Sequence, residues 1–454
     1  MKRFFALISV VLICCMLSAC GNSNTSSDFK DVVTNSVTIT EDAPSNDDTL
    51  NSKTSNTSDN NSKPQTSSEV NNKDENSKPN GIDWGSMNDY LNSDEYKDGV
   101  GKYDNLTEED LYLANMVNSE EDLIAIVERI KNGHTFDSEN IIINKDLDFS
   151  NYEWTPIGTA RTPFMGRIIG NGHTISNIKI SRITSDMCDT TYAAYIGFVG
   201  YAMEAYVGDL NIKNISISIN DANNIENIHV GAVVGSMRAY QTNVHVVNCK
   251  STGNISVASS QKGTVNAGGI VGFYDASLPR TKFNMQWLQS GVNITTRGNI
   301  SNCGGIIGNA ALRDTDSSCI ISDMIYNGKI DDVSNKYSRT GGIFGYFHSS
   351  KPASISNCFA VMNLTRVEDN KLSLAPPVEA VLIGMESTNC AKVTLSNIYG
   401  AVKHNGTVVK KGFIGEKHGE FVMSNCSETT SLPKGVKFDT KKWNLSNLSS
   451  PSFK

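Results

Sequence analysis

The sequence predicts an all-β fold, namely a parallel β-helix or β-solenoid of about seven repeats of roughly 36 residues. A glycine motif, G-x-x-G or a close variant, recurs along the second half of the chain, and its closing glycine returns every 31 to 39 residues. Short runs of β-branched apolar residues separated by Gly and Asn accompany it, as strands joined by tight turns do. Such a period is typical of stacked repeat units rather than one globular core. The closing glycines are Gly200, Gly235, Gly272, Gly308, Gly345, Gly384 and Gly415.

The N-terminus has the pattern of a secretory signal. Two basic residues precede an apolar stretch, residues 4–16, that is too short for a membrane-spanning helix. Residues 17–21, LSACG, then resemble the lipobox of bacterial lipoproteins. The resemblance implies that residues 1–19 are cleaved off and that Cys20 carries a diacylglyceryl group, which anchors the chain in the membrane. An ordinary signal peptide with an incidental cysteine is the alternative.

The next segment, residues 20–80 with the lipidated cysteine at its start, is predicted to be a disordered tether. Ser, Asn, Thr, Asp and Lys dominate it, and such a composition cannot bury enough apolar surface to offset the entropy of ordering. We therefore expect a stalk that lifts the folded part from the extracellular face of the cell membrane, on a Gram-positive surface. A Gram-negative periplasmic or outer-membrane lipoprotein is the alternative.

The charge of the chain excludes some partners. The formal net charge is −8, and it becomes −10 once the two basic residues of the signal are removed. An acidic chain without a basic stripe argues against nucleic acid and against electrostatic docking on anionic lipid. The membrane is thus expected as a partner only through the N-terminal lipid.

A helix is expected in the region that opens the folded part, residues 81–135. Ser119 and Asp122 have the spacing of an N-cap, apolar residues follow at helical intervals, and Asn132-Gly133 can end the helix. Solenoids need a lid with a polar outer face on their terminal repeats. We expect this amphipathic helix to be that lid, and a partner-binding helix is the alternative.

The repeats, which we place at residues 136–430, carry a resemblance. Residues 145–175 contain KDLDFS, WTPIG, FMG and GNGHTI, and repeated G-x-x-G and Asn-Cys pairs follow. This succession, over roughly residues 119–430, resembles bacterial surface proteins with GLUG repeats. The resemblance implies a parallel β-solenoid at the cell surface, usually without an assigned enzymatic activity.

A second column supports the stacking. At 10 to 15 residues after each closing glycine, a polar residue is followed by an apolar one. We expect the polar residue to lie at a turn, stacked on its equivalents in the other repeats, and the apolar residue to lie in the core. The pairs are Asn214-Ile215, Asn248-Cys249, Gln286-Trp287, Asp323-Met324, Asn357-Cys358, Asn397-Ile398 and Asn425-Cys426.

Seven cysteines remain outside the signal and the lipid site. An odd number without a C-x-x-C pair or a short Cys/His cluster argues against a zinc site and a complete disulfide framework. We expect buried free thiols and no metal or cofactor, with one or two disulfides or a metal as alternatives. The seven are Cys188, Cys249, Cys303, Cys319, Cys358, Cys390 and Cys426.

Catalytic motifs are weak. Glycoside hydrolysis needs two opposed carboxylates, and the candidate pairs are Asp146 with Asp148, Asp314 with Asp316, and Asp331 with Asp332. We interpret them as solvated turn or edge residues. The last two pairs could instead bind calcium, although no oxygen-rich loop surrounds them. His173 is expected to be a turn residue, because no nucleophile motif accompanies it.

Aromatic and basic residues beside the repeats are the candidate binding surface, because insertions of a solenoid often form its binding face. Packing of these rings between rungs is the alternative. The candidates are Tyr274, Arg280, Trp287, Tyr337, Tyr346 and His348. Residues 431–454 are expected to seal the C-terminal end of the solenoid.

The sequence therefore leads to a functional hypothesis. Anchor, stalk and repeats together indicate a non-catalytic adhesion or display module that binds host or cell-surface proteins or glycans. A carbohydrate-active enzyme, a lyase or hydrolase, is one alternative. A cell-wall structural protein without a specific ligand is the other.

Overall fold

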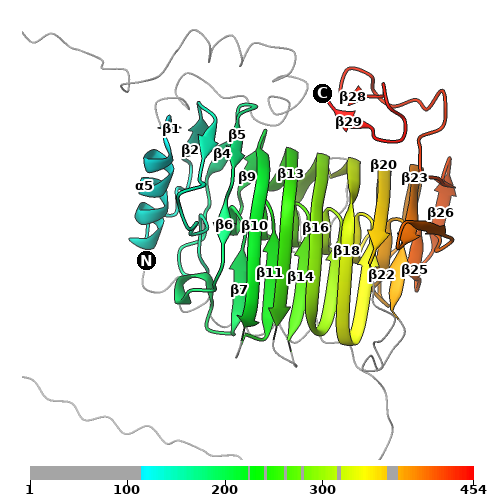
Figure 1. Cartoon of the computed structure of the whole chain (residues 1–454), viewed down its shortest axis with the longest axis horizontal. Helices are drawn as coiled ribbons and strands as arrows, with labels where there is room; N and C mark the ends of the chain where they lie inside the picture. The colour runs from blue at the N-terminus through cyan, green and yellow to red at the C-terminus, as the bar shows by residue number, and fades with distance from the viewer. Residues whose placement is uncertain are drawn as a thin grey trace, which may run out of the picture. The chain divides into compact units, whose positions relative to one another are not determined.

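The chain folds as a parallel β-solenoid, as the sequence predicts (Figure 1). The computed structural model describes residues 114–222, 225–239, 243–259, 263–277, 281–313, 319–365 and 377–454. Within these ranges the structure has one α-helix, α5 (Glu120–Lys131), and no helix long and apolar enough to cross a membrane. The predicted signal, Cys20 and the predicted tether lie outside them.

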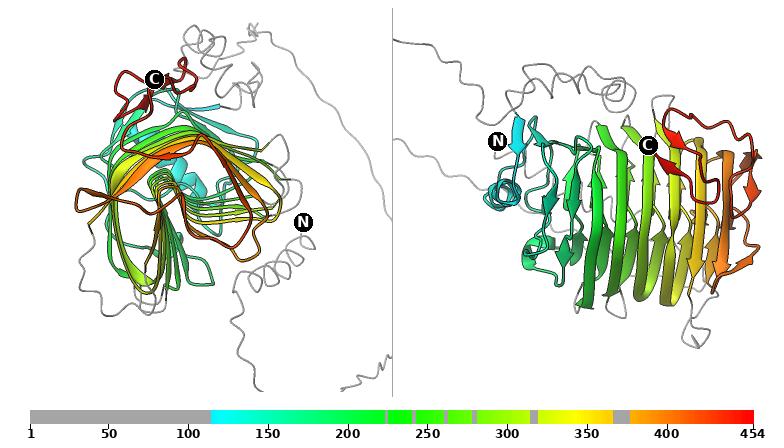
Figure 2. Two further views of the ribbon diagram at one scale, coloured as in Figure 1. Left: turned by 90° about the vertical axis from the view of Figure 1, so that its right-hand side faces the viewer. Right: turned by 45° about the horizontal axis from the view of Figure 1, so that its top comes forward.

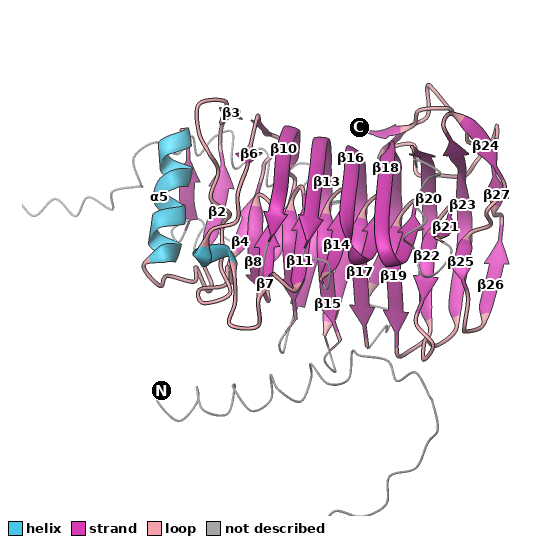
Figure 3. Ribbon diagram, turned by 60° about the horizontal axis from the view of Figure 1, so that its bottom comes forward, coloured by secondary structure: helices cyan, strands magenta, loops and turns pink. Residues whose placement is uncertain are grey.

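One wall of the solenoid is a seven-stranded parallel sheet with one strand for each glycine motif. Figure 3 shows most of its strands side by side in chain order. Seven stacked strands leave six turns between the first and the last, and neighbouring strands of a sheet lie about 4.8 Å apart. The strands are β8 (Val199–Met203), β12 (Val234–Arg238), β15 (Val271–Ala276), β17 (Ile307–Leu312), β19 (Phe344–Ser349), β22 (Ile383–Glu386) and β25 (Ile414–Glu416).

The second sheet holds the rest of each turn. Its long strands bend around the solenoid, and some of its shorter strands run into the glycine motif. The long strands are β10 (Asn211–Ala222), β13 (Asn243–Ser259), β16 (Lys282–Gly304), β18 (Ile320–Gly341), β20 (Ala353–Leu364) and β23 (Val393–His404). The shorter strands are β7 (Ala193–Ile196), β9 (Tyr206–Gly208), β11 (Asn227–Gly231), β14 (Thr264–Gly268), β21 (Val378–Ala380), β24 (Thr407–Val409), β26 (Phe421–Ser424) and β27 (Ser427–Glu428).

The N-terminal end is closed by α5, as expected. The Ser119 side chain accepts a hydrogen bond from the Asp122 amide, and the buried face of α5 packs on the first strands. The sheet begins earlier than expected, because β1 (Ala114–Val117) precedes the helix and pairs with the next strand, β2. The remaining elements here are β2 (Asn140–Ile143), β3 (Leu147–Asp148), β4 (Arg167–Ile169), β5 (Thr174–Ser176), β6 (Lys179–Ile180) and the 3-10 helix η1 (Ser185–Met187).

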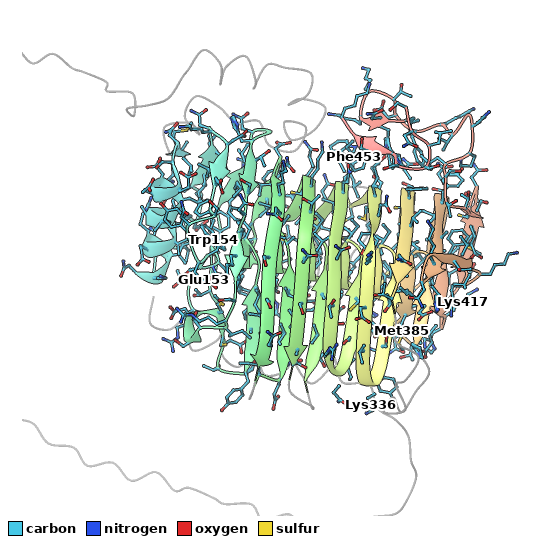
Figure 4. The ribbon with its side chains drawn as sticks, in the orientation of Figure 1. Glu153, Trp154, Lys336, Met385, Lys417 and Phe453 are labelled. Atoms are coloured by element: carbon cyan, nitrogen blue, oxygen red, sulfur yellow. The ribbon has the colours of Figure 1, made fainter. Side chains whose placement is uncertain are left out.

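The WTPIG segment stacks on the first glycine motif. Ile157 bridges Val199 in parallel, and the Trp154 Nε1 atom donates to the Phe198 carbonyl at 3.0 Å. The Trp154 and Phe198 rings stack with centroids 5.4 Å apart, in the N-terminal half of the solenoid (Figure 4). The motif is thus part of the same column as the G-x-x-G turns, one rung before the first of them.

One corner of each turn has a residue in the left-handed backbone conformation. Asn and Asp tolerate this conformation, and bulky residues rarely adopt it. Their φ angles lie between 49° and 55°. The residues are Asp209, Asn248, Trp287, Asp323, Asn357, Asn397 and Asn425.

The observed corner residues show that the predicted column was misplaced in two turns. In the first turn the corner residue is Asp209, to which the Asn248 amide donates at 2.6 Å, and Asn214 lies at another bend on Asn177. In the third turn Trp287 has the left-handed conformation, so Gln286 does not. Trp287 is therefore not a core residue, and the slots predicted for Ile215 and Trp287 belong to Leu210 and Leu288.

The corrected inward column confirms the expected interchange of apolar residues. Strand register aligns its members from Cys249 to Ile398 directly, and they are fully buried there. The column is Leu210, Cys249, Leu288, Met324, Cys358, Ile398 and Cys426. Hydrophobic side chains of different size replace one another here, because this core position requires an apolar side chain and not one particular shape.

All seven cysteines of the described residues are free thiols, as expected. Three are buried and four are partly buried. Burial raises the pKa of Cys249 to about 12, and burial also raises the pKa of Cys358. A thiol that stays protonated is a poor nucleophile and a poor metal ligand, so these cysteines act as small hydrophobic residues.

The C-terminal segment does not seal the end of the solenoid, in contrast to the expectation. From residue 429 it folds back across the outer face of the long strands, and we call residues 429–454 the strap (Figure 2). Its strands β28 (Trp443–Asn444) and β29 (Ser452–Phe453) form a small antiparallel pair. The strap reaches back to Lys250, whose Nζ atom donates to the Lys454 carbonyl at 3.2 Å. Outward-facing apolar residues such as Phe359 attract it to the side instead of the end.

Candidate functional site

The glycine motif folds the wall of the solenoid inward. Each motif joins a strand that enters the turn to a strand of the seven-stranded sheet, and the view along the axis in Figure 2 shows the two diverging from the turn. The strands meet backbone to backbone. A Cβ atom on Gly272 would lie 2.5 Å from the Gly235 carbonyl oxygen and against the Val230 amide nitrogen. Only glycine permits this approach, which explains why the closing position is constant.

Two columns of side chains meet beyond this contact, and we call the surface that they form together the crevice. Parallel register aligns each column along the solenoid axis. On the entering strands the column is Tyr195, His229, Asn266, Asn302 and Arg339. On the seven-stranded sheet it is Tyr201, Ser236, Phe273, Asn309, Tyr346, Met385 and Glu416. The seven members of this column are separated by six spacings of about 4.8 Å, which give the crevice a length of roughly 30 Å.

The N-terminal half of the crevice is an aromatic stack. The Tyr195 ring lies 4.7 Å from the Tyr201 ring and 5.4 Å from the His229 ring, centroid to centroid. The His229 ring in turn stacks on Phe273 at 5.0 Å. The two tyrosines belong to a small apolar cluster separate from the main core. The stack therefore lies outside the solenoid core and covers this half of the crevice floor.

Charged groups flank the stack. The Tyr195 hydroxyl donates to Asp189 at 2.8 Å, and the Arg238 guanidinium pairs with Asp275 at 2.9 Å. Burial lowers the pKa of His229 to about 4, so the ring is neutral at physiological pH. The neutral ring fits its contact, because Nδ1 lies 3.0 Å from the Asn266 amide nitrogen and can accept from it.

We expect acid to destabilise the protein partly through His229. In the folded state this ring does not bind a proton until the pH approaches 4, whereas the unfolded chain binds it near 6.5. Stability is therefore full above pH 6.5 and falls as the pH drops from 6.5 to 4, by about 2 kcal/mol at pH 5. Urea unfolding at pH 7 and pH 5 should show a smaller loss for His229→Phe, which keeps the ring but cannot titrate. An equal loss in both proteins would contradict the assignment.

A chain of amides connects the stack to the C-terminal half. Asn302 donates to the Asn266 carbonyl oxygen at 2.7 Å, and Asn309 donates to the same oxygen from the opposite column at 3.3 Å. Arg339 then donates from Nη1 to the Asn302 carbonyl oxygen at 3.2 Å. Hydrogen bonds thus run without a break from His229 to Arg339 along the crevice floor.

Arg339 is held between two tyrosines, and we call Tyr337, Arg339 and Tyr346 the arginine cradle. Its guanidinium carbon lies 5.5 Å from the Tyr337 ring centre and 5.1 Å from the Tyr346 ring centre, within the range of cation–π attraction. Burial lowers the pKa of Arg339, although guanidinium remains charged at physiological pH. The cradle presents a fixed cation at the C-terminal half of the crevice.

Three buried polar atoms around the cradle have no hydrogen-bond partner among the described residues. They are Nε of Arg339, Oδ1 of Asn309 and Nδ1 of His348. Asn309 neighbours Tyr346 in the sheet, and His348 lies on the same face of β19 as Tyr346. A buried polar atom without a partner costs about 1–3 kcal/mol, so such atoms require an explanation. Their concentration here makes the cradle the strongest candidate site.

The structure separates the candidates that the sequence suggested. Tyr337, Tyr346 and His348 come together at the cradle. Tyr274 is fully buried, and its hydroxyl donates to the Val244 carbonyl at 2.6 Å. The prediction that it belongs to the binding surface is therefore wrong. Trp287 is also no part of this surface: it lies beneath the strap, with the Lys442 ammonium 5.2 Å from its ring centre. The remaining candidate, Arg280, lies outside the described residues.

Most crevice residues were missed, although a signal for them exists. Most lie either one position after the closing glycine or six positions before it, as Asn309 and Asn302 do for Gly308, whereas Tyr195 lies five positions before Gly200. Polar and aromatic types prevail at these two positions, in contrast to the apolar residues between the glycines. The flanks of the motif therefore mark the crevice, and its interior marks the core.

A concavity lies on the outer face of the N-terminal turns. It is an open groove of about 750 Å³ with polar walls. Its side chains bond mainly one another: Asn214 donates to Asn177 at 2.6 Å, and Asn211 donates to Thr174 at 2.9 Å. The groove is lined by Asp146, Thr174, Ser176, Asn177, Asn211, Lys213, Asn214, Thr252 and Gly253.

The candidate carboxylate pairs do not form opposed pairs where the structure describes them. Asp146 accepts from His173 and the Thr174 amide, and Asp148 accepts from Asn177, all on the neighbouring rung.

The other described pair is split between two faces. Asp331 and Asp332 are adjacent in β18, so their side chains point to opposite sides of the sheet. Asp332 is buried among hydroxyls, of which Ser338 is the closest at 2.6 Å. The third pair, at positions 314 and 316, lies outside the described residues. Within the described ranges no group of three or more His, Cys, Asp or Glu residues could hold a metal ion.

Fold and site together define a parallel β-solenoid with a longitudinal crevice. No protein-family model and no curated protein matches the chain. Among solved structures it resembles the crystal structure of a "putative immunoglobulin A1 protease" from Bacteroides ovatus, with 17% sequence identity and a TM-score of 0.48. The match covers 75% of this chain and 91% of that chain.

Proposed function

We propose that the protein is a lipid-anchored binding protein of the bacterial cell surface, whose crevice holds an extended glycan without cleaving it. Cys20 carries the anchor, and the tether of residues 20–80 carries the solenoid outward, in keeping with the resemblance to proteins with GLUG repeats. The observation that carries the binding function is the arginine cradle with its three unpartnered polar atoms.

The lining of the crevice suits a glycan. Sugar rings have flat apolar faces that can lie against aromatic rings, and their hydroxyls bond to amides and guanidinium groups. The crevice offers rings at Phe273, Tyr337 and Tyr346, all at least partly accessible, together with the amide of Asn309. Because the crevice runs straight along the axis for roughly 30 Å, it matches an extended polymer better than a compact ligand.

The crevice is a stronger candidate than the polar groove on the outer face. In that groove the amides of Asn211 and Asn214 already bond to neighbouring side chains. A ligand would have to break these bonds and would gain little in exchange. At the cradle the polar atoms gain partners that they lack in the free protein.

An array of glycans and host surface proteins tests the proposal. We expect glycans to bind, and Tyr346→Ala to weaken that binding at least tenfold, because the ring is one wall of the cradle. Tyr192→Asn is the control, since this tyrosine is 59% exposed and lies outside the crevice. A blank array would support a structural role instead, and new reducing ends in the bound glycan would support an enzyme.

The lipid anchor has its own test. We expect Cys20→Ser to release the protein into the medium, because no thiol remains for the diacylglyceryl group. Fractionation of cells that express the two proteins, followed by immunoblotting, measures this. The unchanged protein should stay with the membrane. Retention of the serine variant there would refute the lipobox assignment.

A further inference from the structure

The cradle concentrates positive charge in an acidic chain. The Lys336 ammonium lies 5.1 Å from the Tyr337 ring centre, on the same ring that contacts Arg339. Figure 4 shows Lys336 at the lower edge of the C-terminal half of the solenoid, in the same part of the molecule as Met385. Neither cation forms an ion pair with a carboxylate of the described residues. The net charge of −8 makes two unpaired neighbouring cations unexpected here.

The free edge of Arg339 has the geometry for a carboxylate. Its hydrogen bond to Asn302 uses Nη1, and Nε has no partner among the described residues. Nε and the adjacent Nη2 form one planar edge with two parallel N–H bonds, and that edge fits the two oxygens of a carboxylate. The stacking on Tyr346 fixes the plane of the guanidinium, which reduces the entropy lost on binding.

The two other unpartnered atoms lie within the same neighbourhood and suit hydroxyls. Asn309 reaches Arg339 through a short chain of bonds, by way of Asn266 and Asn302. Its free Oδ1 is an acceptor, and Nδ1 of His348 can accept or donate according to the tautomer. A ligand with one carboxylate beside two or more hydroxyls would satisfy all three atoms.

Access to Nε requires a small movement. This atom is shielded from water in the free protein, because the guanidinium lies between the Tyr337 and Tyr346 rings. Of these two residues, Tyr337 is 39% exposed. Rotation of an exposed tyrosine side chain takes picoseconds to nanoseconds, so the cradle can open readily. Glu416 also acts on Arg339 electrostatically but forms no ion pair with it. Glu416 therefore does not occupy the carboxylate position.

We propose that the arginine cradle is the subsite for a carboxylate-bearing sugar, so that the glycan recognised by the crevice is a uronic-acid polymer. This inference rests on the proposed binding function and specifies its ligand. Arg339 binds the carboxylate through Nε and Nη2, and Asn309 and His348 bind ring hydroxyls. Lys336 supplies additional attraction at the rim.

Matched acidic and neutral oligosaccharides test the inference. The full chain, in detergent micelles, would be titrated with oligogalacturonate, oligomannuronate and hyaluronan oligosaccharides, and with the same three after chemical reduction of their carboxyl groups. We expect at least one acidic probe to bind, and its neutral form to bind at least tenfold more weakly. Arg339→Gln should remove this difference, Arg339→Lys should restore part of it, and Tyr192→Asn should leave it unchanged.

Each outcome decides between the two proposals. Equal binding of acidic and neutral forms, or full binding by Arg339→Gln, would overturn the uronic-acid subsite and leave glycan binding intact. If only glycans without carboxylates bind, the uronic-acid subsite is likewise overturned and glycan binding stays intact. Binding of no glycan would overturn both. Should the glutamine variant fail to fold, the comparison of acidic and neutral probes on the unchanged protein still decides: equal binding of the two forms overturns the uronic-acid subsite, and at least tenfold weaker binding of the neutral form supports it.

Discussion

Replacement of Gly272 by alanine is expected to disrupt the centre of the solenoid. The added Cβ atom would meet backbone atoms only, namely the Gly235 carbonyl and the Val230 amide, and backbone cannot rotate away as a side chain can. Overpacking of this kind costs about 3 kcal/mol or more. The shift would also separate the two strands that form the crevice floor. Urea unfolding followed by circular dichroism should show an earlier midpoint, and glycan binding should weaken with it.

Gly291→Ala is the matched control. This glycine is also in a strand of the solenoid, but the nearest atom to its added Cβ, the Asn327 carbonyl oxygen, would be 3.6 Å away. We expect its unfolding midpoint to differ little from that of the unchanged protein. Equal effects of the two substitutions would show that the close approach at the G-x-x-G turn is unimportant.

Trp443→Ala is expected to release the strap from the outer face. Trp443 is 1% exposed, packs between Phe438 and Phe453, and donates from Nε1 to Asp323 at 2.8 Å. Loss of a buried tryptophan costs about 3–5 kcal/mol, and this small apolar cluster has few other contacts to compensate. Hydrogen exchange and limited proteolysis should therefore show residues 429–454 exposed. The rungs of the solenoid should remain protected.

Trp443→Phe separates packing from hydrogen bonding. Phenylalanine retains most of the apolar contact, but it leaves the Asp323 carboxylate without its indole donor, at a cost of about 1–3 kcal/mol. We expect the strap to be partly protected from hydrogen exchange and proteolysis, to a degree between that of the unchanged protein and that of Trp443→Ala. If the strap is as protected in the alanine variant as in the unchanged protein, the packing described here does not hold it.

The architecture could be predicted because it depends on features that tolerate few substitutions. A glycine that faces backbone, such as Gly272, cannot be exchanged, so the period of the turns remains visible in the sequence. The same applies to the helix, whose ends are set by Ser119 and by Asn132-Gly133. Short-range rules of capping and repetition are sufficient for such elements.

The site could be predicted only in part, because a shift of one residue reverses the face of a strand. Tyr346 follows its closing glycine directly and faces the crevice. Tyr274 follows its own by two positions and faces the core. Composition does not distinguish these two tyrosines, and strand register does.

Trp287 could not be placed for another reason. Asn or Asp occupies the left-handed corner in the other turns, so the amide of Gln286 suggested the wrong position. Packing of the strap over the indole favours this arrangement, and it comes from residues more than 140 positions away. Local sequence rules carry no information about such a contact.

The strap also changes how the solenoid should come apart. In a stack of repeats each turn contacts its neighbours alone, so the ends can fray independently of the middle. Here the strap links the last turns to earlier ones. The Phe453 amide donates to Gln289 at 3.0 Å, and Trp443 donates to Asp323. Both partners lie several turns before the last glycine motif. The strap closes a long loop of chain around the C-terminal turns. These turns should consequently unfold as one cooperative block, and a force applied through the N-terminal tether should meet its first resistance in the turns that precede the block.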